Sequence, residues 1–110
     1  RDNWYLERDL ADDARYTVKS MPLLAARGRQ AFFEYNPVPF LSDDPERVYR
    51  SVPYGSAVEI LALDMRSYRG ANSENRQPGL DGASALLGPS QIRWLKNRLA
   101  SSRATWKVIA

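Results

Sequence analysis

Apolar residues recur with helical spacing in the first third of the chain. Between residues 6 and 18 an apolar residue stands at every fourth position and acidic residues lie between them, which is the pattern of an amphipathic helix. Ser20 then stands where a helix N-cap belongs, with Pro22 in the first turn, so we expect a second helix that ends at Asn36-Pro37. Its predicted apolar stripe consists of Leu24, Ala31, Phe32 and Tyr35.

The middle of the chain predicts a β-hairpin. Residues 37–45 contain three prolines and cannot continue a helix. Residues 47–54 and 57–65 have the composition of two strands joined by a Gly-Ser turn, and Pro53 restricts the first of them to a sheet edge or to its own end. The second strand is apolar on both faces except for Glu59, which indicates an interior strand covered on both sides.

The last third predicts a loop, a helix and a strand. Residues 70–84 are polar and glycine-rich, so they form either a functional loop or a disordered one. Residues 90–101 have helical periodicity, and residues 105–109 have the composition of a strand. The apolar face of this helix is predicted to hold Ile92, Leu95 and Leu99, and its solvated face Arg93, Lys96 and Arg98.

Two groups of side chains admit a second interpretation. The basic helix face, with Trp94 beside it, resembles a surface that contacts nucleic-acid phosphates, but an ordinary solvated face explains it more simply. A nucleic-acid binder would gather these cations with Arg103 and with Arg69 or Arg76. Phe32, Phe33 and Tyr35 are interpreted as core rather than as a stacking platform.

Composition narrows the possible chemistry. The 110 residues include no His and no Cys, so the chain by itself cannot form a Ser-His-Asp triad, a Cys-His dyad, a zinc finger or an imidazole-bound metal site. With 44% apolar and 26% charged residues the chain has the composition of a globular domain. Its most apolar stretch, 57–63, is far shorter than the roughly 20 residues of a membrane span. Most of its 16 basic residues are arginines, which suit phosphate binding, although codon bias is the simpler explanation.

The most pointed local feature is Asp64-Met65-Arg66, at the end of the predicted interior strand. Side chains two apart on a strand share a face, and ligands of open α/β sheets bind at strand ends. Arg66 is therefore a candidate to hold a phosphate oxygen, with Asp64 orienting its guanidinium group. The alternative is a structural salt bridge that closes the strand end or anchors the long loop, and the residues alone favour this alternative.

Four segments of the chain follow the order of a known pattern. They are Asp2-Asn3-Trp4, 30–37 (QAFFEYNP), 47–69 and 86–109. The last two are the specific ones, since they contain L-D-x-R-x-Y-R, then L-G-x-x-Q-x-x-W-L, then W-K-V. On these motifs the chain resembles the PhoD-like alkaline phosphatase and phosphodiesterase family.

This resemblance implies a metal-dependent phosphoesterase that acts on phosphate mono- or diesters and is exported to the periplasm or beyond. It implies two metal ions, with Ca and Fe as the family's metals, and a metallophosphatase-like catalytic domain with four α/β/β/α layers. Asn3 matches a metal-ligand position, whereas Asp64 and Arg66 match substrate-proximal or structural positions. The other ligand motifs would lie before Asp2 and after Ala110, so the chain would be a central segment that binds no metal and is inactive alone.

The expected fold class is α+β, with about three helices and at least three strands in one partial domain. A helical part would cover residues 1–46 and a strand-loop-helix-strand part residues 47–110. The expected partner is a phosphate ester, with no nucleic acid and no membrane span. In an excised segment, strand 57–63 would expose an apolar face and favour self-association, whereas in a self-standing, non-catalytic interaction module the same strand would be covered on both faces.

Overall fold

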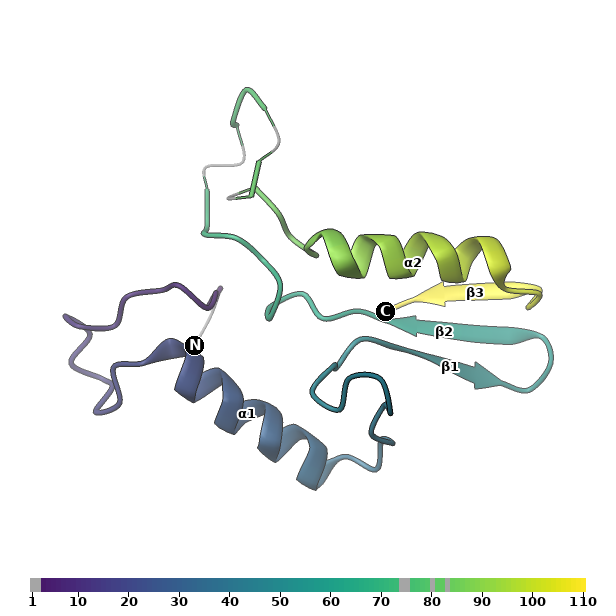
Figure 1. The fold of residues 1–110 in the computed structure, drawn as a ribbon, viewed down its shortest axis with the longest axis horizontal. Coiled ribbons are helices and arrows are strands. Elements are labelled where there is room, and N and C mark those ends of the chain that lie inside the picture. The colour runs from purple at the N-terminus through teal and green to yellow at the C-terminus, as the bar shows by residue number, and fades with distance from the viewer. Residues whose placement is uncertain (1–2, 74–75, 80, 83) are drawn as a thin grey trace.

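A computed structural model describes residues 3–73, 76–79, 81–82 and 84–110 of the chain (Figure 1). Its elements are α1 (Met21–Tyr35), β1 (Arg50–Tyr54), β2 (Val58–Ala62), α2 (Pro89–Ser101) and β3 (Trp106–Ile109). The three strands form one sheet in the order β1-β2-β3, in which β2 runs antiparallel to β1 and parallel to β3. Two helices beside a mixed sheet confirm the expected α+β class.

The helix predicted over residues 6–18 does not form. The backbone there makes isolated turns, in which Arg8 N–H donates to the Tyr5 carbonyl and Asp13 N–H to the Leu10 carbonyl. The Asp9 carboxylate accepts from the backbone N–H two residues ahead at 2.8 Å, and Asp13 does the same at 3.3 Å. Such local bonds offer the backbone an alternative to the helix, and the four-residue apolar spacing did not reveal them.

Helix α1 begins and ends where the sequence predicts. The Ser20 hydroxyl accepts from Leu23 N–H as an N-cap, and the Asn36 side chain donates to the Phe32 carbonyl at 2.8 Å. The predicted stripe is partly wrong, because Ala31 is exposed and Tyr35 is 86% exposed. The face turned inward instead holds Met21, Leu24, Ala25, Phe32 and Phe33.

The predicted hairpin is present, with β1 at the sheet edge as Pro53 requires and β2 in the interior. Glu59 and Leu61 lie on one face of β2 and are buried. The other face is only partly covered: Val52 of β1 is 42% exposed and Trp106 of β3 is 68% exposed. The expectation that strand 57–63 is covered on both sides is therefore wrong for this second face, which has the apolar exposure expected of an excised segment.

Helix α2 confirms the third predicted helix, and its start depends on Gly88. This residue has φ of +72°, and a Cβ atom there would lie 2.9 Å from both the Cβ and the carbonyl oxygen of Tyr68. The stripe that packs on the sheet differs from the prediction: Ile92 is exposed, and Arg98 reaches the buried Glu59. The residues turned inward are Gln91, Trp94, Leu95 and Leu99.

An aromatic cluster packs α2 onto the chain before β1. The ring of buried Tyr49 lies 4.9 Å from that of Trp94 and 5.4 Å from that of Tyr68, centroid to centroid. Burial raises the pKa of the Tyr68 hydroxyl. This cluster holds the segment after β2 against α2, so it helps to fix the strand end where the candidate site lies.

In the described ranges, neither helix has the length and hydrophobicity of a membrane-crossing segment.

Candidate functional site

A cavity of about 500 Å³ opens between α1 and the segment that follows β2. Its α1 wall is mostly apolar but includes Arg29, and Trp4 and Tyr16 from the N-terminal turns close one side. The opposite wall is the stretch 63–67, which includes both Asp64 and Arg66. The fold therefore brings the two predicted strand-end residues together with Trp4, which is distant from them in sequence.

Asp64 does not have the role first considered for it. Strand β2 ends at Ala62 and a turn follows, so the rule that alternate residues share a face no longer applies at residues 64–66. Asp64 is buried, and its carboxylate accepts from the backbone N–H groups of Arg66 and Ser67, both at 2.9 Å. The carboxylate thus shapes the turn that carries Arg66 and does not orient the guanidinium group.

Arg66 is half-buried at the cavity wall. Within the described ranges, its guanidinium group makes neither an ion pair nor a hydrogen bond, unlike that of Arg29, which also lines the cavity and lies 3.4 Å from the Glu46 carboxylate. A planar, permanently charged group without a protein partner can bind a phosphate or carboxylate in a bidentate manner. Arg66 is therefore the candidate ligand-binding side chain of the cavity.

Asn3 lies next to the cavity residue Trp4 and is exposed to solvent. Its φ is +50°, in a region that Asn tolerates better than most residues. The Asn3 carbonyl accepts from the side chain of Asn72 at 2.8 Å, and Asn72 in turn accepts from the Arg69 guanidinium at 2.5 Å. These bonds join the start of the chain to the start of loop 70–84, so the loop has at least one defined contact.

A complete two-metal centre is not formed by the side chains that the structure describes. Among them, no three carboxylates come together in a way that could hold a metal ion. Asp2, the carboxylate nearest to Asn3 in sequence, lies outside the described residues. The position matched by Asn3 would thus need further ligands to hold a metal ion.

Sequence reasoning missed Gln91 as a residue of the site. This α2 side chain is 0% exposed and binds the backbone of Asp64 through both of its polar atoms. Its position three and four residues before Trp94 and Leu95 places it on the buried stripe of α2. One feature of the sequence could have identified Gln91: it is a polar residue on that stripe, within the L-G-x-x-Q-x-x-W-L motif.

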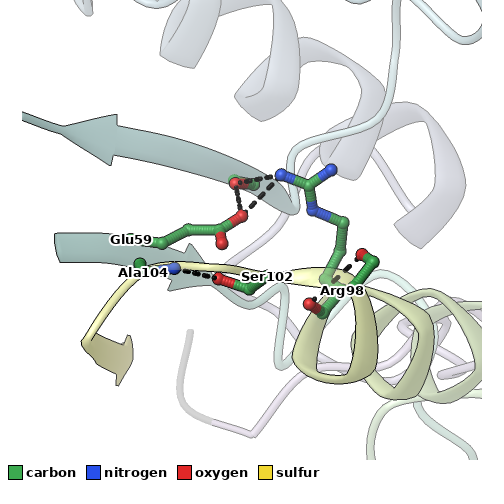
Figure 2. Close-up of polar contacts among 6 residues, drawn as sticks. Glu59, Arg98, Ser102 and Ala104 are labelled. Atoms are coloured by element: carbon green, nitrogen blue, oxygen red, sulfur yellow. Dashed lines mark hydrogen bonds and ion pairs between the residues drawn. The ribbon is translucent and has the colours of Figure 1, made fainter. Parts of the chain in front are cut away.

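A second polar cluster lies on the covered face of the sheet. Glu59 of β2 accepts from Arg98 of α2 at 2.5 Å (Figure 2). Arg98 also donates to the Ser51 hydroxyl at 2.9 Å. Hydrogen bonds from Ser102, then Ser51 and Arg98, lower the pKa of Glu59 to about 2. This cluster stabilises the packing of α2 on the sheet. Arg98 therefore does not belong to the solvated helix face on which the sequence analysis placed it.

The structure is an α+β scaffold with a cavity, and at the wall of this cavity lies Arg66, whose guanidinium group has no partner within the described part of the chain and can bind an anion. Across residues 1–110 the chain matches the family model of the PhoD-like phosphatases. The chain therefore belongs to the PhoD-like phosphatase family.

Among curated proteins, the chain is similar to alkaline phosphatase D of Bacillus subtilis (strain 168). The two sequences are 35% identical over 103 residues, which covers 86% of this chain and 18% of that protein. The chain thus spans about a fifth of the length of this relative. No solved structure matches the chain.

Proposed function

We propose that this chain is part of a metal-dependent phosphoesterase that hydrolyses phosphate mono- or diesters, and that Arg66 binds the phosphate group. The observation that carries the proposal is that the Arg66 guanidinium group borders the cavity and has no hydrogen-bond or ion-pair partner among the residues that the structure describes. The family match over the whole chain supports a phosphate ester as its ligand. The name of the Bacillus subtilis relative, alkaline phosphatase D, agrees with this chemistry.

In this proposal the residues of the chain bind and orient rather than react. Asp64 holds the turn through two backbone N–H groups, so the backbone that carries Arg66 is fixed at the wall of the cavity. A preorganised cation stabilises the negative charge of a phosphate without reorganising during the reaction. Asn3 would contribute one metal ligand, and the remaining ligands of two metal ions, Ca and Fe by family resemblance, would come from outside this chain. The metal ions would activate the nucleophile and neutralise developing charge.

The longer protein is also proposed to act outside the cytoplasm, as the family resemblance implies. The 110-residue chain alone is proposed to be inactive, since Asn3 and the scattered carboxylates of the described residues do not provide the ligands of a two-metal centre. Turnover of a chromogenic phosphate ester by the isolated chain with added Ca, Fe, Zn or Mn ions would contradict this.

The role of Arg66 is tested by Arg66→Ala in the longer protein that contains this chain. Loss of charged hydrogen bonds to the phosphate is expected to lower kcat/KM by about 10- to 100-fold. The assays use p-nitrophenyl phosphate as monoester and bis(p-nitrophenyl) phosphate as diester. Arg93→Ala, at an exposed position on α2, is the matched control and should leave both rates unchanged. Equal rates for the two variants would refute the role of Arg66.

A further inference from the structure

Gln91 is the most completely buried polar side chain in the described part of the chain, with 0% exposure. Its carboxamide is almost fully bonded: the oxygen accepts from Asp64 N–H at 2.7 Å, and the nitrogen donates to the carbonyls of Asp64 and Leu87, both at 2.9 Å. Burying an amide group without hydrogen-bond partners costs free energy, so the buried position of Gln91 depends on this specific set of hydrogen bonds.

Just past the end of β2, the side chain of Gln91 makes the backbone hydrogen bonds that a neighbouring strand would otherwise make. Leu63, just past β2, still donates its N–H to the backbone carbonyl of Ala110 beyond β3, at 2.8 Å. At the next residue, Asp64, both backbone groups bind the Gln91 carboxamide instead. The backbone of Asp64 is thereby held in place from α2, which begins 25 residues later in the sequence.

A continuous series of hydrogen bonds then leads to Arg66. Gln91 fixes the Asp64 backbone, and the Asp64 carboxylate fixes the N–H groups of Arg66 and Ser67. Arg66 forms part of the cavity wall that these bonds define. A shift of about 1 Å in a binding group is enough to reduce catalysis substantially.

We infer that Gln91 is a positioning residue, which sets the place of Arg66 through Asp64 for binding the phosphate of the substrate. This inference rests on the proposed function. The alternative is a purely structural role, in which Gln91 only fastens α2 to the strand end. The two roles differ in whether the effect of Gln91 depends on the Arg66 side chain.

A double-mutant cycle in the longer protein separates these roles. Gln91→Met keeps the side-chain size and removes the hydrogen bonds. It is expected to lower kcat/KM by about tenfold, which is the size of effect expected when a charged hydrogen bond in the site is lost. In an Arg66→Ala background the same change should alter kcat/KM less than twofold, because its target is gone. The melting temperature of each variant is recorded alongside the rates.

Leu99→Ala is the matched control, because Leu99 is a half-buried α2 residue outside this series of bonds. It should lower the melting temperature, with equal effects on kcat/KM in the presence and absence of Arg66. If Gln91→Met does not fold, Gln91→Glu is used in the same cycle, since it keeps an acceptor for Asp64 N–H. Asp64→Asn, which also keeps its acceptor oxygen, should preserve activity, whereas Asp64→Ala should lose it.

The possible results have distinct meanings. Independent, multiplicative effects of the Gln91 and Arg66 changes would overturn the positioning role while leaving the phosphoesterase proposal intact. An active enzyme in which Arg66→Ala equals the wild type would overturn the role of Arg66 and this inference with it. A longer protein that hydrolyses no phosphate ester would overturn the proposed function itself.

Discussion

At the scale of single residues, the buried charged groups of the described residues have different partners and therefore different roles. Arg50 donates to the carbonyls of Pro39, Arg47 and Val48 at 2.7–3.0 Å, and burial lowers its pKa. Asp64 binds backbone N–H groups, and Glu59 binds Arg98. Each of these groups stabilises a local arrangement. The residues that flank Arg50, Asp64 and Glu59 in the sequence do not show that these groups have a different role from Arg66, whose guanidinium group borders the cavity.

Glu59 gives a prediction about pH. Its pKa is lowered from 4.5 to about 2 in the folded chain, so its contribution to stability is present above pH 4.5 and is lost as the pH falls toward 2. The wild type should therefore lose more stability between pH 5 and pH 2 than Glu59→Gln, which cannot titrate. Urea unfolding followed by circular dichroism at several pH values measures this. Parallel losses in the two proteins would contradict the low pKa.

At the scale of elements, local signals predicted most of the boundaries. The Ser20 cap, the Asn36-Pro37 stop and the turn at Gly55 each act within a few residues, and the structure has an element boundary at each. The helix expected over residues 6–18 failed because aspartate side chains there bind the neighbouring backbone. Apolar spacing alone does not report that competition.

The start of α2 gives a prediction at this scale. Gly88→Ala combines a left-handed backbone with overlap against Tyr68, so it should destabilise the chain by about 1–3 kcal/mol. Gly79→Ala is the control, because a Cβ atom there meets nothing within 4 Å. Thermal unfolding of the two variants measures the difference. Equal melting temperatures would show that the Gly88 conformation is not required.

At the scale of the whole molecule, one face of the sheet remains open. Val52, Tyr54, Trp106 and Val108 are large apolar side chains on β1 and β3 that are more than 40% exposed. Their register through Val58 and Ile60 of β2 places them on one face, opposite the face that Arg98 of α2 reaches. A contiguous apolar surface of this kind is typical of an interface.

We expect the isolated chain to self-associate through this open face. Sedimentation of the 110-residue chain should depend on its concentration, and Val52→Lys with Val108→Lys should shift it toward monomer, because lysine is costly to bury in an apolar contact. Arg93→Glu, on the exposed side of α2, is the control and should leave the association unchanged. A wild-type chain that stays monomeric at high concentration would contradict the expectation.

The sequence by itself determined the α+β class, the hairpin, α2 and the family, because capping, turns and ordered motifs act over short distances. It also identified Arg66 and Asp64 as site candidates from their position after an apolar strand. Only the tertiary structure decided what these side chains do. The bonds of Asp64 with Gln91 join residues 27 apart in the chain, and Trp4 lies 60 residues before Asp64 in the sequence. Which groups meet over such distances depends on how the elements pack, and no local pattern specifies that.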